Sequence, residues 1–302
     1  MYWILILGLA FVGREGLAFD RVASLELIHA LPIDGPADSQ PSGLTLSGDT
    51  LYAVSDKHGD TIYRIELMAD RAVFVSHLRF DAPPLDPPLR RMDFEGITHD
   101  DEGDFYLVSE TGFRILRVRA DGGGARWITP SLRPHGETVG LFQARGANLE
   151  GILCLGPQVF LVCAERQPRG LIEVDLRTEP PKILALNYDE TQLEFPAERS
   201  MSFSGLFRDG EDLYVIERNA EAIVRFGYGG EHLVAREVWS YGHIVNRPDL
   251  RYSDMKYGIG EGLCMDRERV YLILDNNGDY RSSAPEDRRP LLLIMKRPSK
   301  DD

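Results

Sequence analysis

The chain has 302 residues, 43% of them hydrophobic, which is enough for one large globular domain and excludes an extended disordered chain. Lys and Arg total 34 against 48 Asp and Glu, so the formal net charge is −14. A surface this acidic argues against nucleic acid and anionic membranes as partners, because phosphate groups bind to basic patches.

The first eighteen residues differ in composition from the rest. Residues 2–12 form an apolar run that is too short to span a bilayer. Residues 16–18 (Gly-Leu-Ala) have the small-x-small pattern of a signal cleavage site, although no Lys or Arg precedes the run. We therefore expect residues 1–18 to be a signal-like segment of a secreted or periplasmic protein with no stable membrane insertion. The alternative is an uncleaved, buried segment of a cytoplasmic protein. Residues 19–302 are expected to form a single domain.

The rest of the chain contains five copies of one pattern. Each copy has a small or acidic residue, a glycine and an apolar pair, followed by a short turn and an apolar run that ends in an acid. The repeated glycines, separated by 53, 55, 54 and 57 residues, are Gly43, Gly96, Gly151, Gly205 and Gly262. This regularity indicates a repeat architecture.

Each copy contains four short stretches with strand character and almost no helical periodicity. In the second copy they are residues 95–98, 105–109, 114–118 and 125–128. Four strands per unit at a period near fifty residues are typical of a propeller blade. We therefore expect an all-β, five-bladed β-propeller, with six blades as the less favoured count.

The last copy is one strand short, because only residues 261–265, 270–274 and 291–295 have strand character. The segment Arg21–His29 precedes the first copy and also has this character. We expect it to supply the missing strand, so that an N-terminal strand closes the last blade and leaves no open sheet edge.

Two rows of polar residues are predicted to share one face. In an antiparallel pair, the start of the first strand lies beside the end of the second. The first row directly precedes the repeated glycines and includes Glu95, Glu150 and Glu261. The second row ends the second strands and consists of Asp56, Glu110, Glu165, Glu217 and Asp275. The long connections between blades lie on this face, where binding sites are commonly built.

The first row is a candidate metal site. Two carboxylates ~5 Å apart repel by roughly 3 kcal/mol at an effective dielectric of ~20. Glu95, Glu150 and Glu261 therefore need a cation, protons or basic neighbours if they converge. Ca²⁺ is the favoured cation because it takes oxygen ligands. The alternative is that these residues are ordinary polar strand starts facing solvent.

The second row is equally well explained by turn chemistry and by hydrogen bonds between blades. Lys57, Arg166 and Arg218 directly follow three of its acids and can pair with them or hold an anionic substrate. Asp275 and Asn276 lie in a segment rich in oxygen ligands and are the candidate catalytic residues. The three cysteines show no metal or disulfide spacing and are predicted to be small buried hydrophobic residues.

As a series, these motifs resemble the esterase-like phytase domain family over residues 42–295. The segments that carry the resemblance include Ser42-Gly43-Leu44, Phe94-Glu95-Gly96-Ile97, Leu149-Glu150-Gly151, Ser204-Gly205-Leu206 and Glu261-Gly262-Leu263. The resemblance implies calcium-dependent hydrolysis of phosphate esters. The Glu-Gly openings are also similar to those of regucalcin-type propeller lactonases, in which a Glu binds the catalytic divalent ion.

Three functions remain open from the sequence. The leading hypothesis is a Ca²⁺-dependent hydrolase that acts on a small anionic phosphate ester or another ester at the mouth of the central channel. The alternatives are a non-catalytic propeller that binds a ligand or a protein, and a regucalcin-like lactonase. A serine hydrolase mechanism is unsupported, because the sequence contains no G-x-S-x-G motif.

Overall fold

The structure is a computed structural model that describes residues 21–188, 193, 199–229, 232–255 and 259–299. The predicted signal-like segment, residues 1–18, lies outside these ranges. Within them, no helix has both the length and the apolar character needed to cross a membrane.

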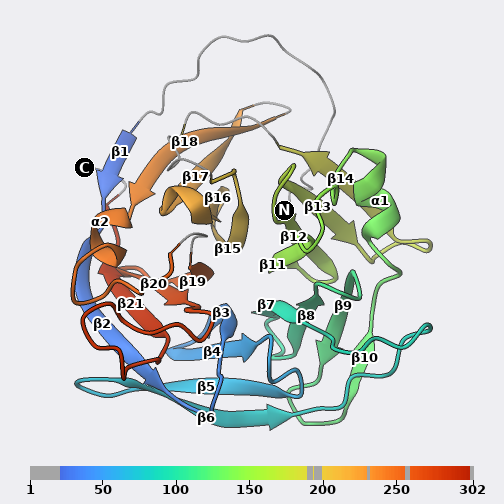
Figure 1. The fold of residues 1–302 in the computed structure, drawn as a ribbon. Coiled ribbons are helices and arrows are strands. Elements are labelled where there is room, and N and C mark those ends of the chain that lie inside the picture. Colours follow the sequence, from blue (N-terminus) through green and yellow to red (C-terminus); the bar gives the residue numbers. More distant parts are fainter. Residues whose placement is uncertain (1–20, 189–192, 194–198, 230–231, 256–258, 300–302) are drawn as a thin grey trace.

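The described chain is all-β and propeller-like, as predicted, and its sheets surround a common centre (Figure 1). One sheet has the order β10-β9-β8-β7 and a second the order β11-β12-β13-β14. Their strands are β7 (Phe94–His99), β8 (Phe105–Ser109), β9 (Arg114–Val118), β10 (Ala125–Trp127), β11 (Leu149–Gly156), β12 (Val159–Ala164), β13 (Gly170–Asp175) and β14 (Lys182–Asn187).

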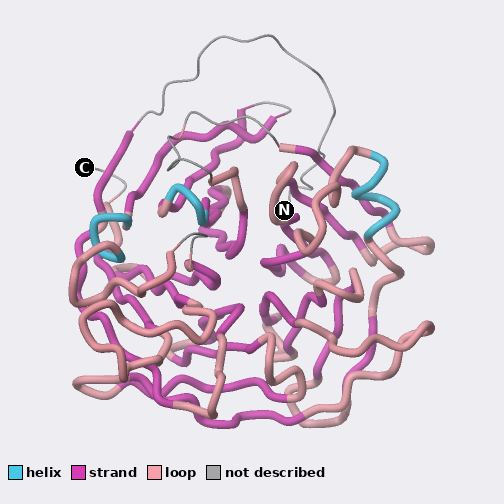
Figure 2. The backbone as a smooth tube through the Cα atoms, in the orientation of Figure 1, coloured by secondary structure: helices cyan, strands magenta, loops and turns pink. Residues whose placement is uncertain are grey.

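The third sheet has the order β1-β18-β17-β16-β15. Its strands are β1 (Arg21–Ser24), β15 (Phe203–Asp209), β16 (Asp212–Glu217), β17 (Ala222–Gly229) and β18 (His232–Ser240). The helices of the described chain are short and lie in connections between strands (Figure 2). They are α1 (Arg133–Thr138), the 3-10 helix η1 (Arg218–Ala220) and α2 (Gly242–Val245).

The fourth sheet has eight strands in the order β19-β20-β21-β2-β6-β5-β4-β3. They are β2 (Glu26–Asp34), β3 (Pro41–Ser47), β4 (Thr50–Ser55), β5 (Thr61–Leu67), β6 (Ala72–Arg79), β19 (Gly260–Met265), β20 (Arg269–Leu274) and β21 (Leu291–Lys296). Its two halves are joined narrowly, because β2 pairs with β6 only at Ile33–Ala72 and Asp34–Val73. By contrast, β2 runs antiparallel to β21 over most of its length.

The N-terminal strand does pair with β21, but its predicted bounds, Arg21–His29, are wrong. The strand that pairs with β21 is Glu26–Asp34, whereas Arg21–Ser24 pairs in parallel with β18. The physical reason is Leu25, which is buried between the two segments and donates its backbone N–H to Ser240 O at 2.9 Å. The chain therefore changes sheets at this residue.

The repeated glycines allow the five inner strands, β3, β7, β11, β15 and β19, to pack in direct contact. A Cβ atom on Gly151 would lie 2.1 Å from Ser204 O, and one on Gly262 would lie 2.5 Å from Leu44 N. The other three glycines face the backbone of the next inner strand in the same way. Any larger residue would push neighbouring strands apart, which explains the repeat.

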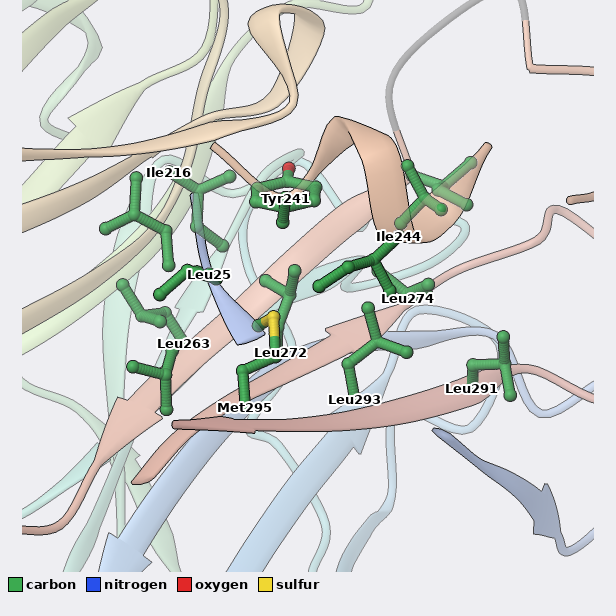
Figure 3. Close-up of a cluster of buried hydrophobic side chains, with 14 of the residues drawn as sticks. Leu25, Ile216, Tyr241, Ile244, Leu263, Leu272, Leu274, Leu291, Leu293 and Met295 are labelled. Carbon is green, nitrogen blue, oxygen red and sulfur yellow. The ribbon is translucent and has the colours of Figure 1, made fainter. Parts of the chain in front are cut away.

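The hydrophobic core lies between neighbouring sheets. Figure 3 shows one of its clusters, which gathers Ile216 from one sheet, Leu272 and Met295 from the adjacent sheet, and Leu25 and Tyr241 from connecting segments. The second strands β8, β12, β16 and β20 are almost completely buried, as their apolar sequences predict. Among the cysteines, Cys163 and Cys264 are buried, Cys154 is half-buried, and all three are free thiols.

Candidate cation site at the centre of the inner strands

The strand register brings the two predicted rows of polar residues to one edge. Phe94 pairs with Ser109, Leu149 with Ala164, and Gly260 with Leu274. The inner strands therefore begin where the second strands end, as the sequence predicted. This edge carries an acidic cluster, which we define as Asp56, Asp93, Glu95, Glu110, Glu150, Glu165, Glu261 and Asp275.

A β-bulge directs each first-row glutamate. The strand register shifts between Phe94 and Gly96, and again between Gly260 and Gly262. Glu95 and Glu261 are the extra residues of these bulges, and a bulge leaves its residue unpaired and turns its side chain. The inner strand β11 has a corresponding shift at Glu150. The repeat pattern in the sequence showed the position of these glutamates but not the bulge.

Serines occupy the same bulge position in the other two inner strands. Ser42 Oγ donates a hydrogen bond to Phe94 O at 2.6 Å, and Ser204 Oγ donates one to Gly260 O at 2.7 Å. Each bond joins an inner strand to the next one. These serines therefore tie the strands together, whereas the glutamates place carboxylates at the centre.

The three first-row glutamates lie within electrostatic reach of one another. Burial raises the pKa of Glu95 well above its usual value, and the charges of Asp56, Glu110 and Glu261 raise it further. Burial also raises the pKa of Glu150; Arg218 opposes this effect, and Glu95 and Glu261 add to it. The carboxyls therefore favour a bound proton or a cation.

Arg218 provides a basic neighbour on one side of the cluster. It begins η1 directly after β16, and its side chain is only 11% exposed. Its Nη1 donates to both oxygens of Glu261, at 2.7 and 2.9 Å, while Nη2 contacts Glu165 and lies 3.9 Å from Glu150 Oε1. Burial alone would lower the pKa of Arg218. The negative charges of Glu261 and Glu150 outweigh this effect, so the pKa of Arg218 is raised.

The other side of the cluster is an open carboxylate triad, formed by Asp56, Asp93 and Glu95. One ligand oxygen from each residue lies within 4.8 Å of the other two. Lys57 contacts Oδ2 of Asp56, and Arg91 Nη2 lies 3.3 Å from Oδ2 of Asp93. The second oxygen of each aspartate, Oδ1, is buried and has no hydrogen-bond partner among the described residues. Leaving such atoms unsatisfied is costly, so this arrangement favours a ligand.

The open triad fits Ca²⁺. Ca²⁺ binds carboxylate oxygens at ~2.3–2.6 Å, so oxygens on opposite sides of the ion lie ~4.6–5.2 Å apart. The span of up to 4.8 Å in the triad is compatible with this geometry. Of the sequence-predicted metal ligands, only Glu95 belongs to the triad, while Glu150 and Glu261 face Arg218.

Sequence reasoning missed Asp93, which lies two residues before Glu95. Its backbone has a φ of 48°, a left-handed conformation that Asp tolerates better than most residues. Burial raises its pKa, and Arg91 partly opposes this effect. The sequence did contain a signal at the position two residues before the bulge residue of each copy. In the other four copies this position holds Gln40, Asn148, Ser202 and Ile259. Only the second copy places a carboxylate there.

The predicted catalytic residues Asp275 and Asn276 differ in their surroundings. Burial, together with the charges of Glu261 and Asp56, raises the pKa of Asp275 to about 7, while a hydrogen bond from Asn277 N opposes the shift. Asn276 is buried, and its side-chain amide donates to Arg288 O at 2.8 Å. Asn276 thus holds the loop after β20, whereas Asp275 belongs to the acidic cluster.

The remaining predicted residues take different positions. Arg166, 24% exposed, contacts Glu165 and donates to Gly146 O at 3.3 Å. Lys57 is 33% exposed. Glu217 is not part of the acidic cluster. Its carboxylate pairs instead with the buried Arg169, at 3.0 Å.

Residues 40–235 match the family described as "Phytase-like: Esterase-like activity of phytase". This span is well over half of the chain. The chain belongs to the phytase-like family. The matched span includes the whole open triad and Arg218, whereas Glu261 and Asp275 follow it. The family suspected from the sequence motifs is therefore confirmed.

Several solved structures are similar to this chain at low sequence identity. Glutaminyl cyclase from Myxococcus xanthus aligns with a TM-score of 0.54 and 10% identity, covering 93% of this chain and 100% of its own. Aldose sugar dehydrogenase from Streptomyces coelicolor, in its PQQ-bound form, aligns with a TM-score of 0.48 and 13% identity, covering 91% and 98%. Virginiamycin B lyase from Staphylococcus aureus aligns with a TM-score of 0.45 and 12% identity, covering 90% and 99%. No curated protein matches the phytase-like chain.

Proposed function

We propose that this phytase-like protein is a Ca²⁺-dependent hydrolase of phosphate or other esters that acts at the acidic cluster. The observation that carries the proposal is the open triad, in which two buried aspartate oxygens have no hydrogen-bond partner in the part of the chain that the structure describes. Membership of a family described by esterase-like activity supports the reaction class.

Asp56, Asp93 and Glu95 would hold the cation. A cation bound there would polarise an ester oxygen and lower the pKa of a water molecule. Asp275 is our candidate general base, because a carboxyl with a pKa of about 7 can accept a proton at neutral pH. Its charge interacts with that of Asp56.

The more exposed basic residues beside the acidic cluster are our candidates for binding an anionic substrate. Arg91 is 58% exposed and Lys57 33% exposed, and each contacts one outer oxygen of the triad. Arg166 is a third candidate, with a 24% exposed side chain. Arg218 is less suited to this role, since its terminal nitrogens already contact Glu261 and Glu165.

The proposal is tested by measuring hydrolysis of p-nitrophenyl phosphate and p-nitrophenyl acetate with Ca²⁺ and after chelation. We expect calcium-dependent turnover of at least one ester, and at least a tenfold loss of kcat/KM in Asp93→Asn. Asp70→Asn is the matched control, because Asp70 also pairs with an arginine close to it in the chain, Arg71 at 3.2 Å, but is exposed in the turn between β5 and β6. Absence of calcium-dependent turnover with either ester would contradict the proposal.

The two alternatives predict other outcomes once calcium binding and lactone turnover are measured beside the ester assay. Calcium binding with no ester turnover would favour a non-catalytic binding propeller. Turnover of a lactone, with neither ester hydrolysed, would favour a lactonase.

We further propose that the sheets form five blades and that β2 completes the last one. The narrow contact between β2 and β6 supports dividing the eight-stranded sheet into two blades. The close approach of Gly262 to the first inner strand supports closure. We also propose export after cleavage of residues 1–18, which a mass measurement of the secreted protein starting near residue 19 would test.

A further inference from the structure

The acidic cluster has two sides that balance their charge differently. On one side, Glu150, Glu165 and Glu261 surround the nearly buried side chain of Arg218. On the other side is the open triad, whose basic contacts come from exposed side chains at its edge. The first side already contains a positive charge, whereas the second has two buried oxygens with no hydrogen-bond partner within the described ranges.

The position of Arg218 matches that of a bound cation. Its guanidinium contacts carboxylates from the sheets on either side of its own, with Glu261 on β19 and Glu165 directly after β12. Nη1 donates to both oxygens of Glu261 while Nη2 contacts Glu165, and charge-assisted hydrogen bonds of this kind are stronger than bonds between neutral groups. A guanidinium remains protonated in proteins, so this charge is permanent.

We propose that Arg218 is a built-in cation that replaces a second metal ion, so that the chain binds one divalent cation, at the open triad. The proposal rests on the calcium site of the proposed function. Two-metal hydrolases hold their ions ~3.5–4 Å apart with carboxylates around both. Here the carboxylates of the second position are taken by Arg218. The reaction would then be a one-metal ester hydrolysis, with Arg218 holding Glu261 and Glu165 in place.

The number of bound ions tests the proposal without relying on turnover. Calorimetric titration of Ca²⁺ into the full, chelator-treated chain should give one ion per chain. Asp93→Asn should weaken binding by about tenfold or more, because it removes a ligand charge. Glu261→Gln should leave the affinity within about threefold, because Glu261 faces Arg218 and not the ion, and Arg218 keeps its contacts with Glu165 and Glu150.

A gain of binding is the sharper test. Arg218→Gln removes the built-in charge from beside Glu150 and Glu261 and leaves Arg166 as the contact of Glu165, so a second Ca²⁺ should bind. Arg218→Lys keeps the positive charge and is the matched control, with one ion expected. Adding Glu165→Gln to the Arg218→Gln variant should weaken the second site again.

Several results would overturn the proposal. They are two ions in the wild type, a folded Arg218→Gln variant that still binds one, and loss of binding in Glu261→Gln. If Arg218→Gln does not fold, the wild-type count and Glu261→Gln decide. A wild type that binds no Ca²⁺ would contradict the proposed function. In that case, a first ion gained by Arg218→Gln would still support the role of Arg218, and no gain would refute it.

Discussion

Arg91 shows how a single residue beside the site can be tested. Its guanidinium lies at the edge of the open triad and is more exposed than Lys57. An exposed charge pair contributes only ~0.2–1 kcal/mol, so Arg91→Gln should raise KM for p-nitrophenyl phosphate by about two- to fivefold. The neutral p-nitrophenyl acetate should show no such change, because it carries no charge for Arg91 to attract.

The control for this prediction is Arg119→Gln. Arg119 is also an exposed arginine that pairs with an aspartate two residues away, Asp121, but it lies in the turn between β9 and β10. If Arg91→Gln raised KM equally for both esters, Arg91 would act on the shape of the site and not on substrate charge.

At the residue scale, the sequence predicted which carboxylates approach one another. It did not predict which of them form the open triad and which face Arg218. The antiparallel register followed from the repeat, and it placed Glu95, Glu150 and Glu261 at one edge. The direction of Arg218 could not be predicted, because it depends on the turn of η1 after β16. Asp93 was missed because it precedes the repeated pattern and because nothing in the pattern indicates its left-handed backbone conformation.

At the element scale, the glycine of each inner strand was predicted and its physical role became clear in the structure. The sequence spacing located the inner strands, and their apolar neighbours located the second strands. The β-bulges are invisible in the sequence, because they arise from pairing with the neighbouring strand. The bounds of β2 were misjudged for a similar reason, since its partners β21 and β6 are chosen by long-range packing.

The contact of β19 with β3 gives a prediction about closure. A Cβ atom on Gly262 would lie 2.5 Å from Leu44 N, and one on Gly96 would lie 2.7 Å from Glu150 O. We expect Gly262→Ala and Gly96→Ala to lower the melting temperature by similar amounts. Overpacking typically costs ~1–3 kcal/mol, which is roughly 2–12 °C for a domain of this size.

Gly210→Ala separates crowding from backbone strain in this comparison. Gly210 lies in an open turn with no atom near a Cβ, but its φ is 63°, so it measures the cost of a left-handed backbone alone. A Gly262→Ala variant as stable as the wild type, beside a destabilised Gly96→Ala, would show that β19 does not press against β3.

At the scale of the whole molecule, buried carboxyls make stability depend on both pH and Ca²⁺. Burial raises the pKa of Asp275 from 3.8 to about 7, and burial raises that of Glu173, on β13, from 4.5 to about 7. An acid whose pKa is raised by folding binds more protons in the folded state than in the unfolded state. Its contribution to stability is therefore full below the unfolded pKa and is lost as the pH rises through the folded pKa.

We therefore expect the melting temperature of the calcium-free protein to fall as the pH rises from about 4.5 to 8. Added Ca²⁺ should raise it most at pH 8, where the carboxylates are ionised and no proton competes with the ion. Differential scanning calorimetry at several pH values, with Ca²⁺ and with chelator, measures both effects.

Glu173→Gln removes the titration of a carboxyl far from the acidic cluster, so it should reduce the fall with pH while keeping the calcium effect. Asp93→Asn should abolish most of the calcium effect, and it should also reduce the fall with pH, because the raised pKa of Asp93 contributes to that fall. Equal calcium stabilisation at pH 5 and pH 8 would show that the ion does not bind through these ionised carboxylates.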